Sequence, residues 1–186
     1  MSSREAILNS IREIHRDLKP LPEVPSFGIK RDMVKDFTTS LIGNKAEVMD
    51  SSAFEFWLKS SGMNRVFSAV PEYISYSRVT LPKDPHDLEN LELAILEGQF
   101  GVAENGAIWL DDNQLPHRAM PFITEHLVLI VPKGHLVENM HQAYQKIGNT
   151  SSGFGLFIAG PSKTADIEQS LVIGAHGAKS LRVVLV

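Results

Sequence analysis

The feature that most constrains the fold is a set of short apolar runs in the C-terminal half of the chain. Leu127–Val131 is apolar at every position and is closed by Pro132, and Leu181–Val186 is apolar except for Arg182. Gly155–Ala159 is a third run of this kind. Strands that are apolar throughout, rather than at alternate positions, are typical of a parallel sheet covered on both faces. We therefore expect an α/β fold with a largely parallel sheet.

The last part of the chain predicts a βαβ unit. Between the strands Gly155–Ala159 and Leu181–Val186 we expect a helix from about Thr164 to Ile173, closed by Gly174. The loop before this helix then follows the carboxyl end of a strand, which is where open parallel sheets bind their ligands.

Helical and strand patterns alternate along the rest of the chain. An N-terminal amphipathic helix is predicted by the spacing of Ile7, Ile11, Ile14 and Leu18, with Ser2 or Ser3 as its cap. We divide the chain into residues 1–30, which hold this helix and a Pro-rich linker, and one α/β domain at residues 31–186. The other expected helices are Asp32–Ile42, Ala53–Ser60 and Leu136–Ile147. The other expected strands are Glu47–Met49, Asn64–Val70, Val102–Glu104 and Ala107–Leu110. The apolar run Leu91–Leu96 is compatible with either a strand or a helix.

Composition limits the chemistry of the chain. Its 186 residues suffice for one domain with a sizeable core. The absence of cysteine excludes disulfides, thiolate-held iron–sulfur clusters or zinc, and a cysteine nucleophile. The 7 histidines lack the spacing of a ligand set, and no glycine-rich nucleotide loop or G-x-S-x-G motif is present. We therefore expect no metal and no cofactor.

Charge and hydropathy limit the partners. The 18 Lys and Arg residues are scattered and outnumbered by 22 Asp and Glu residues, so no basic stripe exists for nucleic acid. No apolar run approaches the roughly 20 residues that cross a bilayer. The polar start lacks the apolar region of a signal peptide. We expect a cytoplasmic protein without a membrane span.

The loop that begins at Gly160 is the first candidate site. Gly160 permits close backbone approach, Ser162 and Thr164 supply hydroxyl groups, and Lys163 supplies a positive charge. The free N–H groups of a following helix would hold a small anion. The alternative is purely structural, with Thr164 capping the helix and Asp166 favoured in its first turn by the helix dipole.

Two other places carry candidate residues. His176 follows the expected helix, whose ten residues would put it roughly 15 Å from Lys163, so we expect a structural or interface role for it. Asn105-Gly106 predicts a type I′ hairpin turn. Glu104, directly before that turn, is either a solvated edge residue or a carboxylate positioned for nucleophilic chemistry.

These motifs resemble a known family. Gly160-Pro161-Ser162-Lys163-Thr164-Ala165-Asp166-Ile167-Glu168, followed by Ile173-Gly174-Ala175-His176-Gly177, resembles the C-terminal signature of the LUD-domain family, of the lactate-utilisation protein C type. Ala103–Leu110 and His126-Leu127-Val128 stand where that family has its Glu-x-Gly hairpin and a strand led by histidine. The resemblance runs from about Glu47 to Val186. Lys163, Asn105 and Ala178 depart from the arginine, threonine and proline of the family pattern.

The resemblance implies a three-layer α/β sandwich of the NagB/RpiA/CoA transferase-like group. It also implies a role in oxidation of L-lactate to pyruvate beside two partner proteins that carry the iron–sulfur clusters, with which the lack of cysteine agrees. Taken with the motifs above, the candidate site residues are Glu104 as a catalytic candidate, Asn105, Gly106, Gly160, Ser162, Lys163, Thr164 and Asp166 as ligand-binding residues, and His126 and His176 as secondary candidates.

Three functions stay open at this point. The first is a non-redox subunit of a lactate-oxidising system that binds a small anionic or nucleotide-like ligand. The second is a CoA-transferase-like or formyltetrahydrofolate cyclo-ligase-like enzyme, because Ala103-Glu104-Asn105-Gly106 resembles the Ser-Glu-Asn-Gly signature of CoA transferases. The third is an interaction module that uses the N-terminal helix. A homo-oligomer is compatible with each.

Overall fold

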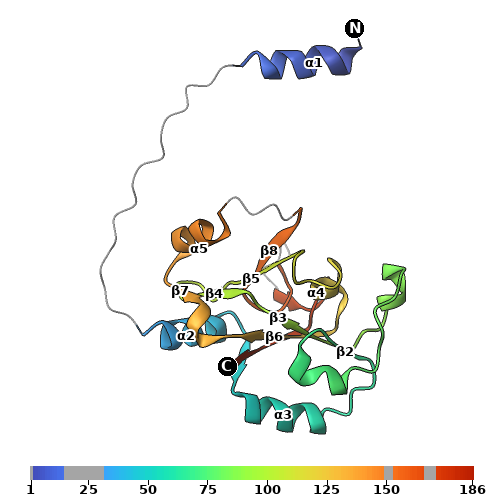
Figure 1. Cartoon of the computed structure of the whole chain (residues 1–186), viewed down its shortest axis with the longest axis vertical. Helices are drawn as coiled ribbons and strands as arrows, with labels where there is room; N and C mark the ends of the chain where they lie inside the picture. Colours follow the sequence, from blue (N-terminus) through green and yellow to red (C-terminus); the bar gives the residue numbers. More distant parts are fainter. Residues whose placement is uncertain (1, 15–31, 149–152, 166–170) are drawn as a thin grey trace.

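A five-stranded parallel sheet forms the centre of the molecule (Figure 1). The structure is a computed structural model and describes residues 2–14, 32–148, 153–165 and 171–186. The strands lie in the order β1 (Glu47–Met49), β11 (Ser180–Leu185), β6 (His126–Val131), β3 (Leu93–Glu97) and β2 (Val66–Ser68), and every neighbouring pair is parallel. The predicted α/β class with a largely parallel sheet is confirmed.

Both faces of this sheet are covered, which explains its unbroken apolar strands. On β6, Val128 and Ile130 point to one face and pack with α3 (Ser51–Ser60) and the 3₁₀ helix η1 (Pro71–Tyr76). Leu127, Leu129 and Val131 point to the other face and belong to a separate cluster. Burying apolar side chains on both faces stabilises the strand at about 25 cal/mol per Å² of apolar surface removed from water.

The second face is covered by α2 (Met33–Gly43) and by a further sheet that the sequence did not predict as a unit. Its strands lie in the order β7 (Leu136–Val137), β4 (Phe100–Val102), β5 (Ile108–Asp111) and β8 (Gly155–Ile158). Phe37 of α2 and Ile108 of β5 are fully buried in the cluster that joins the two sheets. The helix α5 (Met140–Ile147) packs on the outer face of this second sheet through Ala143.

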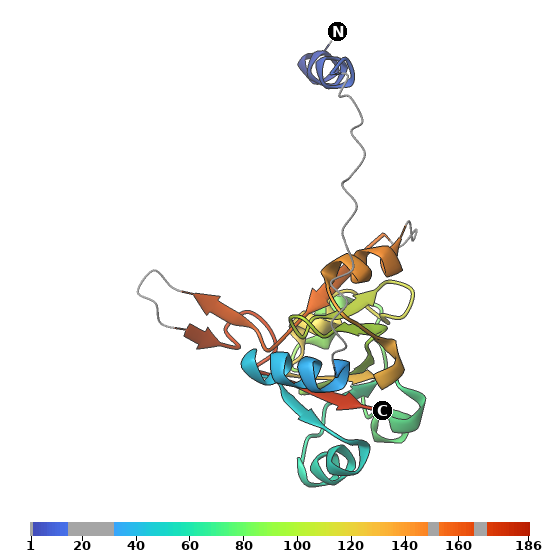
Figure 2. The ribbon, with the colours of Figure 1, turned by 90° about the vertical axis from the view of Figure 1, so that its left-hand side faces the viewer.

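The predicted βαβ unit is wrong. β8 pairs antiparallel with β5 in the second sheet, not with β11. Instead of a helix over residues 164–173, β9 (Lys163–Ala165) and β10 (Leu171–Ile173) form a two-stranded antiparallel arm that projects from the body (Figure 2). β-Branched Thr164, Val172 and Ile173 favour strands over helices, which agrees with this outcome.

Local capping sets the helix starts. Asp32 and Asp50 accept hydrogen bonds from the backbone N–H groups of Lys35 and Ala53, so α2 and α3 begin close to their predicted positions. The helix predicted over Leu136–Ile147 is wrong in its first turn, because residues 136–137 form β7 and Asn139 caps α5. The ambiguous run Leu91–Leu96 contributes to β3, and β1 has the predicted bounds. The remaining short helices are η2 (Pro85–Leu88), α4 (Met120–Ile123) and η3 (Lys133–His135).

The N-terminal helix α1 (Ser3–Arg12) stands apart from the α/β body (Figure 1). Ser2 is the N-cap, one of the two predicted caps, and it forms a complete capping box with Glu5. No residue of α1 is buried, and Ile7 and Ile11 are 61% and 59% exposed. Leu18 and the proline connector lie outside the described residues. Among the described helices, none is long and apolar enough to span a membrane.

The end of α2 is a Schellman motif with an unusual residue. The Ala46 N–H donates to the Leu41 carbonyl, and the Lys45 N–H donates to the Ile42 carbonyl. Lys45 therefore takes a left-handed conformation with φ of 70°, where glycine is normally found. The Cβ atom makes this conformation costly for lysine.

We expect Lys45→Gly to raise the free energy of unfolding by about 1 kcal/mol, because it removes the Cβ strain. Urea denaturation of both proteins measures this. Asn90 has φ of 66°, and Asn90→Gly should stabilise less because asparagine tolerates this region better. A Lys45→Gly protein less stable than the native chain would contradict the strain argument.

Candidate functional site

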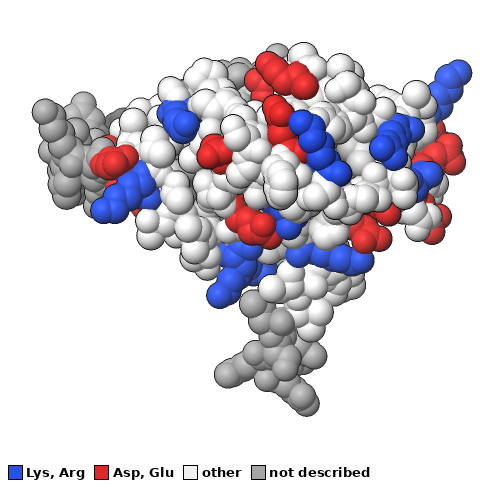
Figure 3. Space-filling model, turned by 90° about the horizontal axis from the view of Figure 1, so that it is seen from below, with Lys and Arg blue, Asp and Glu red and all other residues white. Residues whose placement is uncertain are grey.

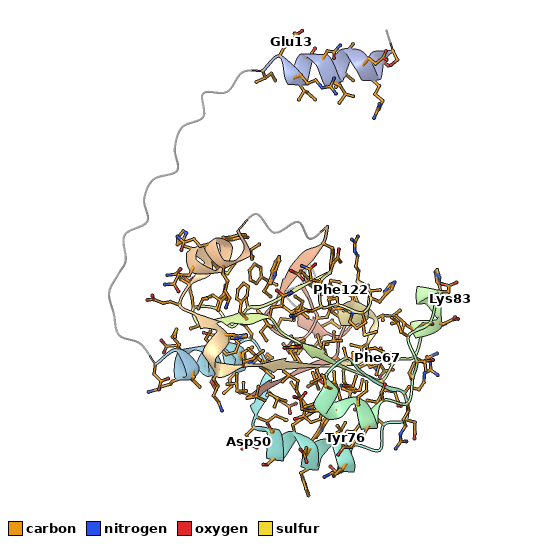
Figure 4. All side chains as sticks on the ribbon, in the orientation of Figure 1. Glu13, Asp50, Phe67, Tyr76, Lys83 and Phe122 are labelled. Atoms are coloured by element: carbon orange, nitrogen blue, oxygen red, sulfur yellow. The ribbon has the colours of Figure 1, made fainter. Side chains whose placement is uncertain are left out.

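Two loops that the sequence singled out meet at a hollow of about 310 Å³. One loop leads from β8 into the arm, and the other leads from the arm into β11. Their side chains share the hollow with Phe122 of α4, labelled in Figure 4, and with Leu127 at the start of β6. The hollow thus lies at the amino end of β6, not at the carboxyl ends of the parallel strands, because β8 belongs to the second sheet.

His176 lines the same hollow as Lys163, so their expected separation by a helix is wrong. The arm returns the chain to its starting point, and its base is fixed by two hydrogen bonds. The Ser162 N–H donates to the Ala178 carbonyl at 2.9 Å, and the Gly174 N–H donates to the Ser162 carbonyl at 2.9 Å. The loop therefore leads into strand β9 rather than into the expected helix N-terminus, and Lys163 and His176 are the ionisable groups among the residues described at the hollow.

Asn44, which directly follows α2, is a site residue that the sequence did not single out. It caps the C-terminal end of α2 and lines the hollow. Its side-chain N–H donates to the carbonyl of Asn105 at 2.7 Å. A Cβ atom on Gly160 would lie 2.5 Å from the Asn44 carbonyl oxygen, so only glycine permits this contact.

The hairpin with Glu104, Asn105 and Gly106 docks on α2 rather than lining the hollow. The predicted type I′ turn is wrong: Gly106 has φ of 72°, but Asn105 is not among the positive-φ residues. The Asn105 side-chain oxygen instead accepts from the Ala107 N–H at 3.0 Å. A Cβ atom on Gly106 would lie 2.9 Å from the Leu41 nitrogen, so this glycine allows the hairpin to approach the helix backbone.

The exposed Glu104 carboxylate contacts a helix terminus. It accepts from the Met140 N–H at 3.1 Å, at the first position of α5. The Glu104 N–H donates to the Glu138 carbonyl at 3.0 Å. A carboxylate at this end of a helix satisfies a free N–H group and complements the helix dipole. This geometry favours the structural interpretation of Glu104.

His126 begins β6 but alternates with Leu127, so it faces the α3 side of the sheet. Its Nδ1 atom is 2.8 Å from the Ser180 hydroxyl, to which Arg182 also donates at 2.9 Å. Arg182 pairs with Glu47 at 2.9 Å and lies over the ring of Trp57, 4.1 Å from its centroid. Burial, and then the charge of Arg182, lower the pKa of His126 from its ordinary value of 6.5.

The hollow combines positive and apolar groups. Lys163 and His176 are exposed at its surface, while Leu127 is buried in its wall. The residues described there include no carboxylate, and no described group of His, Asp and Glu could hold a metal. Thr164 pairs with Val172 in the arm, and Asp166 lies outside the described residues. Such a hollow suits a small anion with an apolar part.

Elsewhere the surface charges are mixed. On the face shown in Figure 3, acidic and basic side chains are interspersed. Several belong to ion pairs of opposite sign, such as Lys59 with Glu55 and Arg182 with Glu47. This pattern differs from the continuous basic surface that nucleic-acid binding requires.

Comparison of the sequence with known proteins gives three findings. The family model of the LUD domain matches residues 84–186. Lactate utilization protein C 1 of Bacillus mycoides (strain KBAB4) is 37% identical over 92 residues, covering 46% of this chain and 39% of that protein. Lactate utilization protein C of Shouchella clausii (strain KSM-K16) is 27% identical over 187 residues, covering 95% of this chain and 77% of that protein.

A solved structure supports the fold. A crystal structure of a DUF162 family protein from Deinococcus radiodurans superposes with a TM-score of 0.61, over 83% of this chain and 96% of that chain. Its sequence identity is 14%, so this likeness concerns the fold alone.

The lowered pKa of His126 predicts a pH-dependent stability. As pH falls below 6.5, the unfolded chain takes up a proton before the folded chain does. This contribution to the free energy of unfolding should therefore decrease from pH 6.5 down to the folded pKa and stay constant below it.

Urea denaturation of the native chain and of His126→Gln between pH 5 and pH 8 measures the difference. Glutamine keeps a polar group beside Ser180 but does not titrate. We expect the native chain to lose more stability than His126→Gln as pH falls. Parallel stability curves would contradict the assignment.

Proposed function

This chain belongs to the LUD-domain family, whose model matches more than half of its length, and from that premise we propose that it is a non-redox subunit in the utilisation of L-lactate. Within that role it binds a small carboxylate in the hollow between Asn44, Lys163 and His176. Two relatives that carry the name lactate utilization protein C support the pathway. The single observation behind the ligand class is the convergence of Lys163 and His176 on one apolar hollow.

The chemistry of the hollow supports a carboxylate ligand. The Lys163 ammonium offers a point charge, and protonated or neutral His176 offers a ring N–H donor. The Ser162 hydroxyl and the Asn44 amide stand in the same wall. Phe122 and Leu127 add apolar surface for a short carbon chain. L-Lactate and pyruvate have this combination of a carboxylate and a methyl group.

The division of labour follows from composition. Oxidation of lactate moves two electrons and therefore needs a redox carrier. With no cysteine, this sequence supplies no thiolate for an iron–sulfur cluster. We assign the electron transfer to iron–sulfur partner proteins and ligand binding to this chain. A cytoplasmic location and a homo-oligomeric state stay predictions.

The N-terminal helix is our candidate for docking onto such a partner. Ile7, Ile11 and Ile14 are each about 60% exposed, and the first two lie one turn apart on α1. A helix of 10 residues is only marginally stable by itself, so burial of this apolar stripe would supply most of its stability. The boundary between residues 30 and 31 also stays a prediction.

The enzyme alternative gains no support from the position of Glu104. The carboxylate is exposed and bonded to the start of α5, whereas a nucleophilic carboxylate needs a desolvated pocket and donors for the reacting oxygen. The CoA-transferase-like or cyclo-ligase-like activity therefore stays a prediction from the resemblance.

The ligand proposal predicts that Lys163→Ala reduces the thermal stabilisation that a ligand gives. Thermal unfolding of the native protein should shift upward with L-lactate, pyruvate or phosphate, because a ligand that binds only the folded state stabilises it. Lys163→Ala should lose most of this shift. Lys133→Ala removes an exposed lysine outside the hollow and should keep the full shift. Equal shifts in all three proteins would remove Lys163 from the site.

The pathway proposal predicts a growth defect. Deletion of the gene in its host should prevent growth on L-lactate and leave growth on glucose intact, and the native gene should restore it. A gene with Ile7→Asp and Ile11→Asp should not restore growth, because two charges on the apolar stripe prevent docking. Asn9→Asp, on the opposite face of α1, should restore it. Full growth of the deletion strain on lactate, with no second copy present, would overturn the proposal.

A further inference from the structure

A second hollow, of about 290 Å³, lies on the outer face of the second sheet. α5 covers one part of this face, where Ala143 packs with Phe100 and Val102. Beyond the last turn of α5, at Lys146 and Ile147, the face is open and the hollow begins. Its walls come from the end of β3, from β4 and β5 with their adjoining loops, from η3 and from the end of α5. Neither the family resemblance nor the proposed function uses them.

Trp109 forms the aromatic wall of this hollow and is held in place by its neighbours. Its ring lies 4.8 Å from that of Phe157 and 6.4 Å from that of Phe100, with an angle of 23° to the latter. A Cβ atom on Gly155 would overlap the indole ring, so the glycine lets the ring lie against β8. A ring fixed in this way is a ready stacking surface, because little side-chain freedom is lost when a ligand binds.

A buried carboxylate stands beside the ring. Asp111 lies two residues after Trp109 on the same face of β5 and is only 3% exposed. Its Oδ1 atom accepts from the Gln99 side-chain amide and from the Asn113 N–H, and its Oδ2 atom accepts from the Asn113 side-chain amide at 3.3 Å. The two bonds from Asn113 order the following turn, which is a structural task, and they leave Oδ2 with a single, long hydrogen bond. No described lysine or arginine forms an ion pair with Asp111, so further N–H donors would stabilise its charge.

Other polar groups complete the wall. Glu97, the last residue of β3, borders this hollow and also a hollow on the α3 side of the central sheet, and Gln114 adds an amide. Lys146 lies over the Phe100 ring at 5.1 Å, and Nδ1 of His135 is 3.1 Å from the Gln99 carbonyl. The ammonium of Lys146 disfavours a simple cationic amine. Carboxylates only accept hydrogen bonds, so the fitting ligand is flat, neutral and rich in N–H donors.

We propose that this hollow binds an amino-substituted nitrogen heterocycle of the nucleobase type, stacked on Trp109 with its N–H groups donating to Asp111 and Glu97. Both a free nucleoside and a nucleotide offer this chemistry. In a nucleotide the phosphate would face Lys146 and His135. The site is separate from the hollow at Lys163, so this proposal can be tested independently of the lactate proposal.

The test measures the fluorescence of Trp109 itself. The sequence has two tryptophans, and Trp57→Phe leaves Trp109 alone while keeping a ring beside Arg182. We expect saturable fluorescence quenching by guanosine, cytidine or their monophosphates, with binding confirmed by calorimetry. Uridine and inosine, which lack the amino group, should bind at least about tenfold more weakly. Tighter binding of the monophosphates identifies a nucleotide, and equal binding identifies a nucleoside.

Variants make the test specific. Asp111→Asn and Glu97→Gln should each weaken binding of guanosine by about tenfold. If Asp111→Asn does not fold, Glu97→Gln provides the test, because a substitution at the exposed Glu97 should not disturb folding. Glu89→Gln, an exposed carboxylate outside the hollow, should bind as the native chain does. Absence of saturable binding, equal binding of uridine and cytidine, or unchanged affinity in Glu97→Gln would each overturn the proposal.

Discussion

The docking of one helix end against two distant loops is the interaction on which the candidate site depends. The last turn of α2 holds the hairpin through Ser40, which donates to the Ala103 carbonyl at 2.9 Å, and through Asn44, which donates to Asn105. The same Asn44 presents its carbonyl to Gly160 in the wall of the hollow. The left-handed Lys45 turns the chain from α2 into β1 and so fixes this arrangement. One helix end therefore contacts both loops.

This arrangement changes the meaning of the two sequence motifs. Gly106 and Gly160 are needed because a Cβ atom at either position would overlap the backbone at the end of α2. The Glu104 carboxylate accepts a hydrogen bond from the free Met140 N–H at the start of α5. A sequence signature can therefore arise from close packing as readily as from chemistry. What remains for chemistry at the hollow is the smaller group of Lys163, His176 and Asn44, of which Lys163 and His176 stand in the C-terminal signature.

Local signals predicted much of the fold. Aspartate caps set the starts of α2 and α3, and the unbroken apolar run of β6 predicted a sheet covered on both faces. The C-terminal unit failed because short apolar runs do not reveal which sheet they join. β8 is apolar because its partly buried side chains pack alternately on the cluster between the two sheets and on the cluster under α5, so it looked like a parallel strand. The expected distance between His176 and Lys163 was wrong for the same reason, because it assumed a helix between them. Asn44 was unpredictable because its partner Asn105 is 61 residues away.

The two hollows meet at one pair of rings. Phe157 lines the hollow at Lys163, and its ring packs against Trp109, which lines the hollow at Asp111. Energetic coupling between sites requires an element with two discrete arrangements, and spatial proximity alone does not provide one. Here Phe100, Trp109 and Phe157 pack together over Gly155, and this dense packing favours a single arrangement. The shared wall is thus better suited to holding two rigid, independent surfaces than to transmitting a change between them.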